Sequence, residues 1–210
     1  MAKGNSVWKQ LQGKKDTATK KIEMEIFDVE AEFTIKYREA EEIQKVNEKY
    51  DELLPDEKVI PVRLGDETVK VTIPATSDKE KEKLKKFEEH PDVKSELKEY
   101  KEKAEPISTE RSAAVACEFL IKKERPEAED LEKGDTIKYK GEVVEITDVT
   151  EDEIKFEYKG NKTKLDKDDP SLPAKILLDR LRITDINKIV NPGMKMLGLD
   201  DGLEKARKNS

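Results

Sequence analysis

The sequence is poor in the side chains that most often perform chemistry: it has one cysteine, Cys117, and one histidine, His90, in 210 residues. A single cysteine cannot form an internal disulfide, and this pair falls short of the ligands that a zinc site needs. The only histidine, His90, precedes a proline in a charged helical segment, so we expect no Cys–His or Ser–His pair that activates a nucleophile. No glycine-rich phosphate-binding or dinucleotide-binding pattern is present either. We therefore expect a protein that is not an enzyme and has no catalytic residues, no metal and no cofactor.

Apolar residues are also scarce. They make up 34% of the chain and aromatic residues 5%, whereas charged residues reach 43%. A typical soluble domain is about 45–50% apolar and about 25% charged. The hydrophobic core is therefore expected to be modest or divided among small units, and a large all-β sandwich is not favoured.

The charges of the two signs nearly balance, because 49 acidic residues oppose 42 basic ones and the net charge is −7. A nucleic-acid-binding protein needs a basic face that displaces counterions, so we expect no nucleic-acid partner. The lysines within residues 1–20 are the local exception. This segment either contacts an anionic partner or forms a solvated polar tail.

Long apolar runs are absent as well. No stretch approaches the roughly 18–20 apolar residues that a membrane-spanning helix requires. No uninterrupted apolar segment follows the opening MAKGNSVWKQLQGKK, so a signal peptide is not expected. These features predict a soluble cytoplasmic protein with no membrane partner.

Two β-hairpins are predicted in the first third of the chain. Apolar and polar residues alternate between Ile22 and Tyr37, with a change of phase at residues 28–30 that indicates a turn or a bulge. The second strand leads without a Gly or Pro into a helix over 39–54, which has the spacing of an amphipathic helix. A second hairpin is predicted over 58–74, with its turn at Gly65.

Charged helical segments follow. A helical arm is predicted over 77–104, opened by a capping box of Ser77 and Glu80. It is divided at His90–Pro91 and ended by Pro106. The next segment, 108–123, is the most apolar run of the chain and is predicted to be a buried central helix.

The last third combines a β module with helices. Residues 127–169 predict about four short strands that form a small SH3-like β-barrel or meander. Residues 170–199 predict C-terminal helices, with Thr184 or Asp185 as a cap and Gly198 as a left-handed stop. Residues 200–210 form a second polar tail. The predicted fold class is α+β, with a core over 21–126 that the C-terminal helices complete.

Two apolar helix faces, at 113–121 and 176–197, exceed what the short strands could cover. They either close on one another as an ordinary core or leave a groove for a partner protein. The C-terminal face contains two methionines, and methionine adapts to varied surfaces. It supplies the candidate protein-binding residues, which are Ile186, Ile189, Val190, Met194, Met196 and Leu197.

Three segments together resemble a known family. FTIKYREAEEIQKVNEKY, from residue 33, resembles the opening of the tailed-phage tail assembly chaperones, where a hairpin leads directly into a helix with an acidic start. LRITDINKIVNPGMKMLGL, from residue 181, is similar to the terminal helical element of that family. STERSAAVACEFLIKK, from residue 108, fits the central apolar helix. The resemblance covers about 80–90 residues, and the hairpin at 58–74 with its charged arm and the β module at 131–168 look like insertions.

The resemblance implies a non-enzymatic assembly factor of the host cell cytoplasm. Such a chaperone would bind the tape measure protein and help to recruit the tail-tube protein, without being kept in the finished particle. Two alternatives stay open. One is a structural virion subunit of the tail, baseplate or connector, which would self-associate through a large symmetric interface. The other is a stand-alone adaptor whose SH3-like module binds a peptide.

Overall fold

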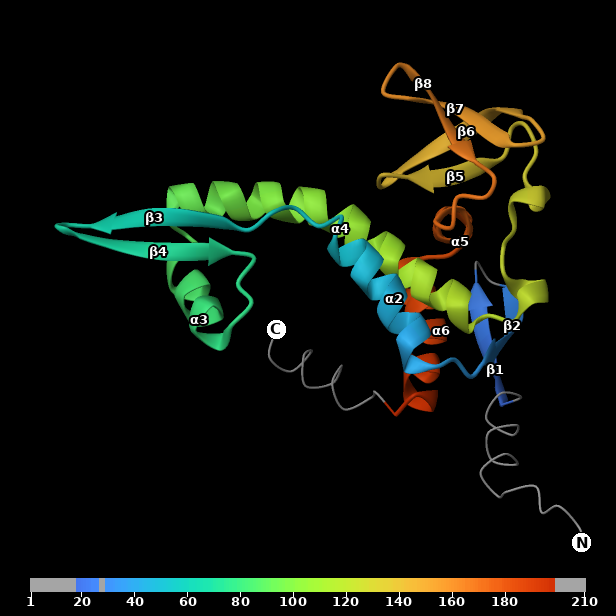
Figure 1. Cartoon of the computed structure of the whole chain (residues 1–210), viewed down its shortest axis with the longest axis horizontal. Helices are drawn as coiled ribbons and strands as arrows, with labels where there is room; N and C mark the ends of the chain where they lie inside the picture. The colour runs from blue at the N-terminus through green and yellow to red at the C-terminus, as the bar shows by residue number, and fades with distance from the viewer. Residues whose placement is uncertain (1–17, 27–28, 199–210) are drawn as a thin grey trace, which may run out of the picture. The chain divides into compact units, whose positions relative to one another are not determined.

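The computed structural model describes residues 18–26 and 29–198, and it has the mixed α+β composition that the sequence predicts (Figure 1). The polar tails predicted at 1–20 and 200–210 lie largely or wholly outside the described residues. The chain divides into two compact units. Unit 1 comprises residues 1–49 and 109–210, and unit 2 comprises residues 50–108. The two boundaries fall inside helices α2, Ala40–Asp51, and α4, Pro91–Phe119.

The N-terminal hairpin of unit 1 is confirmed. Strand β1, Thr19–Ile26, pairs antiparallel with β2, Val29–Lys36, and the register places Ile26 opposite Val29. The hairpin leads into α2 as predicted, and this helix begins with Glu41 and Glu42 in its first turn, where negative charge is favourable. The change of phase predicted at residues 28–30 falls partly outside the described residues.

Helix α4 corrects two predictions. It runs unbroken from Pro91 to Phe119, so the arm does not end at Pro106 and residues 108–123 are not a separate helix. Pro106 lacks the N–H that would bond to the carbonyl group four residues earlier, which costs roughly 3 kcal/mol in a helix interior. Burial of the side chains that follow, from Ala113 to Phe119, offsets that cost. Sequence periodicity alone could not weigh these two effects.

The first core of unit 1 joins the hairpin to the helices. Ile22, Met24 and Ile35 of the hairpin pack with Ile43 of α2 and with the apolar end of α4. The two C-terminal helices, α5 (Leu172–Arg180) and α6 (Ile183–Met196), complete this core. The central apolar helix segment is therefore covered on several sides, as its composition predicts.

The β module is a four-stranded antiparallel meander. Strands β5 (Thr136–Tyr139), β6 (Glu142–Val149), β7 (Glu153–Tyr158) and β8 (Asn161–Asp166) follow one another across the sheet (Figure 1). The strands do not close into a barrel in the described part of the chain, so of the two predicted forms the structure has the meander. Ile137, Ile146 and Phe156 on its inner face pack against Leu172 and Ile176 of α5. Helix α5 covers the inner face of the meander and adds apolar surface to its small core.

Unit 2 contains the second hairpin and its helical arm. Strand β3, Lys58–Leu64, pairs with β4, Glu67–Ile73, around a turn at Gly65, whose φ is 64°. Helix α3, Asp78–Phe87, opens with the predicted Ser77–Glu80 capping box, and α4 begins at Pro91 as predicted. The small core of unit 2 is formed by Ile60, Val62, Val71, Ile73 and Val93.

Candidate protein-binding surface

Helix α6 carries all but one of the predicted binding residues, and its two ends explain where it lies along the chain. It begins at Ile183, so Thr184 and Asp185 lie within its first turn and the prediction that one of them caps it is wrong. Asp185 instead pairs with Lys188 at 2.7 Å and places negative charge at the helix start. At the other end Gly198 adopts a φ of 71°, and its N–H donates to the Lys195 carbonyl group at 3.0 Å. This left-handed stop is confirmed.

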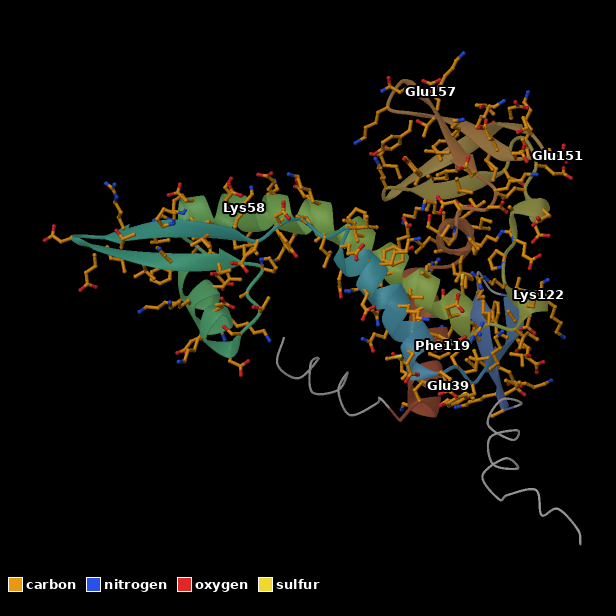
Figure 2. The ribbon with its side chains drawn as sticks, in the orientation of Figure 1. Glu39, Lys58, Phe119, Lys122, Glu151 and Glu157 are labelled. Carbon is orange, nitrogen blue, oxygen red and sulfur yellow. The ribbon has the colours of Figure 1, made fainter. Side chains whose placement is uncertain are left out.

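The inner face of α6 is fixed in the core of unit 1. Ile186 and Ile189 are fully buried, so their side chains offer no surface to a partner. One turn further on, Gly193 lies directly against the ring of Phe119, the last residue of α4 (labelled in Figure 2). A Cβ atom at position 193 would come within 2.4 Å of the ring. The absent side chain therefore lets the backbone of α6 approach α4 closely.

The other four predicted residues are half-buried and lie at the edge of this core. We call Val190, Met194, Met196 and Leu197 the apolar rim. Their side chains pack against the core and keep part of their surface exposed. The structure thus separates the six candidates into two buried anchors and four residues that a partner could reach.

Residues from other elements border the same core but were not predicted as binding residues. Ile26 and Phe33 of the hairpin and Val46 of α2 are also half-buried against it. The hairpin and α6 pack against each other, although they come from opposite ends of the sequence. Alternation in the hairpin identified these positions as apolar, but no local pattern shows which distant helix they meet.

A cluster of charges holds the segment that follows the hairpin to the end of α4. The Arg38 guanidinium donates to the Glu118 carbonyl group at 2.6 Å and also pairs with the Glu118 carboxylate at 3.1 Å. Arg125 pairs with the same carboxylate at 3.2 Å. Nearby Lys36 has a pKa below its usual range, because partial burial and the adjacent Arg38 both disfavour its charge. The three basic residues line a depression of about 410 Å³ that acidic groups also border.

A second polar cluster lies in the interior of unit 1. The Lys175 ammonium group is almost fully buried and donates to Glu110 of α4 at 2.7 Å and to the Ser171 hydroxyl group. Ser171 also donates to Asp169 at 2.6 Å just before α5. The cluster joins α5 to α4 and satisfies the buried charge with hydrogen bonds, which gives it a structural role.

The two side chains best suited to catalysis or metal binding, Cys117 and His90, belong to different units. Cys117 is buried, and its burial raises the pKa of the thiol to about 12, so the thiolate needed for nucleophilic attack is not formed near neutral pH. His90 lies between α3 and α4 of unit 2, with Nδ1 3.9 Å from an Asp92 oxygen. Within residues 18–26 and 29–198, no group of three or more His, Cys, Asp and Glu side chains could hold a metal ion.

The meander carries a small aromatic patch. Tyr139 meets both Phe156 and Tyr158 edge-to-face, with ring centroids 5.0 and 5.1 Å apart. Lys140 and Lys159 lie over the two tyrosine rings at 5.4 and 5.2 Å. Half-buried tyrosines beside cations are a common setting for peptide contact.

Comparison with protein-family models, with curated proteins and with solved structures finds no match for this chain. Within the described residues, none of the helices has both the length and the apolar character needed to span a bilayer.

Proposed function

We propose that the chain is a non-enzymatic assembly factor of the tail assembly chaperone kind, acting in the host cell cytoplasm. Its client would be the tape measure protein, an elongated helical protein, and it would help to bring tail-tube subunits to that client. The observation that carries the proposal is the apolar rim of α6. Four half-buried apolar side chains, two of them methionines, border the core along the second half of α6 and just after its end.

The rim is suited to a client with a repetitive apolar stripe. Methionine is unbranched and polarizable, so Met194 and Met196 can each adjust to client side chains that differ in detail. Ile186, Ile189 and Gly193 hold the inner face of α6, beside the rim, in the core. A rigid support with an adaptable edge allows binding without reorganisation of the whole unit.

The burial of these side chains suggests substitutions that separate a loss of binding from a loss of folding. Ile189→Asp would place a charge in a fully buried site and should abolish cooperative unfolding, so it tests the fold alone. Met194→Gln with Met196→Gln changes two half-buried side chains and should leave the circular dichroism spectrum intact. Lys195→Gln, between them and exposed, is the matched control.

Binding of the candidate tape measure protein should then be measured by co-purification after co-expression. The double methionine variant should lose the client, whereas Lys195→Gln should retain it. Equal recovery of the client by both variants would rule out the apolar rim as the binding surface.

The aromatic patch of the meander favours a second candidate function, that of an adaptor which binds a peptide. Tyr139 and Tyr158 present half-buried rings at the end of the sheet. Under this alternative, Tyr139→Ser should abolish partner binding, and the double methionine variant should bind normally.

A further inference from the structure

Among the described residues, one edge of the N-terminal hairpin is bonded to another element and the other edge is bonded to none. On β2, the Ile121 N–H donates to the Thr34 carbonyl group at 3.1 Å, and the Thr34 N–H donates to the Glu124 carboxylate. The backbone of Thr34 therefore points away from β1. In the described part of the chain, β1 makes no backbone hydrogen bond to any element except β2. Helix α6 packs against both strands on the face that carries Ile22 and Met24, so it does not cover the edge of β1.

The pairing register shows which groups that edge presents. Thr34 lies opposite Lys21, so Lys21 also points its backbone N–H and C=O outward. Because the pattern repeats every second residue, Thr19, Glu23 and Glu25 do the same. An eight-residue strand whose outward donors and acceptors have no backbone partner among the described residues is a template for another strand.

The exposed face of the hairpin carries an electrostatic imbalance. Glu23 lies directly opposite Glu32, and Glu25 lies directly opposite Glu30. Like charges in such positions destabilise a strand pair. The Lys21 ammonium group forms an ion pair with the Glu32 carboxylate at 2.7 Å. On the paired strand β2, the residue opposite Glu23 is acidic, so Glu23 has no basic side chain opposite it in the hairpin.

A second copy of the same strand would supply the missing positive charge. Two β1 strands related by a two-fold axis must run antiparallel, and outward-pointing residues must face each other. With the axis at Ile22, Lys21 of each copy lies opposite Glu23 of the other, and Ile22 lies opposite its own symmetry mate. An axis at Lys20, Lys21 or Glu23 places identical charges opposite each other, and an axis at Met24 places Glu23 opposite Glu25. Among these registers, only the axis at Ile22 avoids like-charged pairs.

We propose that two copies of this chain associate through the open edge of β1, antiparallel about Ile22, so that the two hairpins form one four-stranded sheet. Two Lys21–Glu23 pairs fix the register, and the apolar face becomes continuous across the junction. The proposal does not depend on the identity of the client.

The test is the oligomeric state of the full chain, measured by sedimentation velocity at concentrations up to about 100 μM. The wild-type chain should show a concentration-dependent dimer. Lys21→Glu and Glu23→Lys should each weaken it by about tenfold or more, because each change replaces two attractive pairs by two repulsive ones. Glu23→Pro, which removes an outward N–H, should weaken it as well. Lys133→Glu and Glu129→Lys, exposed positions outside the hairpin, are the charge-matched controls.

A mixture of the two charge variants gives the sharpest result. The Lys21→Glu chain has acidic side chains at both positions 21 and 23, whereas the Glu23→Lys chain has basic side chains at both. The two variants should therefore form a mixed dimer, because each acidic position of one chain then faces a basic position of the other. Circular dichroism of each variant checks that the chain stays folded, including the variant that loses the Lys21–Glu32 ion pair. A monomeric wild-type chain would overturn the proposal, as would a dimer that none of the edge variants affects, or a mixture in which no mixed dimer forms.

Discussion

Replacement of Gly193 by alanine tests the close contact between α6 and α4 in unit 1. The added Cβ would lie 2.4–2.6 Å from three ring atoms of Phe119, well inside normal contact distance. Phe119 is fully buried and cannot swing into solvent to relieve the clash. Forcing extra atoms into a packed core typically costs about 1–3 kcal/mol. The helix-forming preference of alanine over glycine returns at most about 1 kcal/mol.

We therefore expect Gly193→Ala to lower the free energy of unfolding by up to about 2 kcal/mol. Urea unfolding followed by far-ultraviolet circular dichroism measures this change. The same substitution in a Phe119→Leu background should be neutral or stabilising, because the ring is gone and the helix preference remains. If Gly193→Ala raises stability in the wild-type background, the close packing of α6 on α4 is refuted.

Three further predictions concern single side chains. Cys117 should resist a thiol reagent at pH 8 in the folded chain and react at once in urea, because burial raises its pKa to about 12; rapid reaction of the folded chain would contradict this. Hydrogen bonds from Ser77 and Thr76 lower the pKa of the Glu80 carboxyl group to about 2. The stabilising effect of the ionised Glu80 carboxylate on α3 should therefore be complete above pH 4.5 and lost as the pH falls toward 2. In Glu80→Gln that pH dependence, followed by circular dichroism, should disappear, and an unchanged profile would be evidence against the capping box. Lys175→Met should lower the free energy of unfolding in urea by about 1.5–3 kcal/mol, because it removes the charge-assisted hydrogen bonds that the buried ammonium group donates to Glu110 and Ser171; an unchanged unfolding midpoint would contradict this.

Local patterns in the sequence were enough to predict most of the strands and the ends of several helices. The alternation through Ile22 and Ile35 predicted the first hairpin, and Ser77 with Glu80 predicted the start of α3. Gly198 predicted the left-handed stop of α6. Each of these signals acts within a few residues, so no knowledge of the tertiary structure was needed.

Predictions failed where tertiary packing decides the outcome. Pro106 is a local signal to end a helix, yet burial of the residues that follow keeps α4 intact. The separation of Ile186 and Ile189 from the apolar rim depends on which side of α6 faces α4, and the composition of the helix does not show that. Gly193 was visible in the sequence, but its role depends on Phe119, which lies more than 70 residues earlier in the chain.

The most direct test of the proposed function is the location of the chain during and after tail assembly. Quantitative mass spectrometry of finished particles and of the soluble fraction from the same cells would measure it. The chaperone proposal predicts that the chain is absent from finished particles and present in a soluble complex with the tape measure protein. A fixed, stoichiometric amount of the chain in finished particles would contradict the proposal and identify it as a structural subunit.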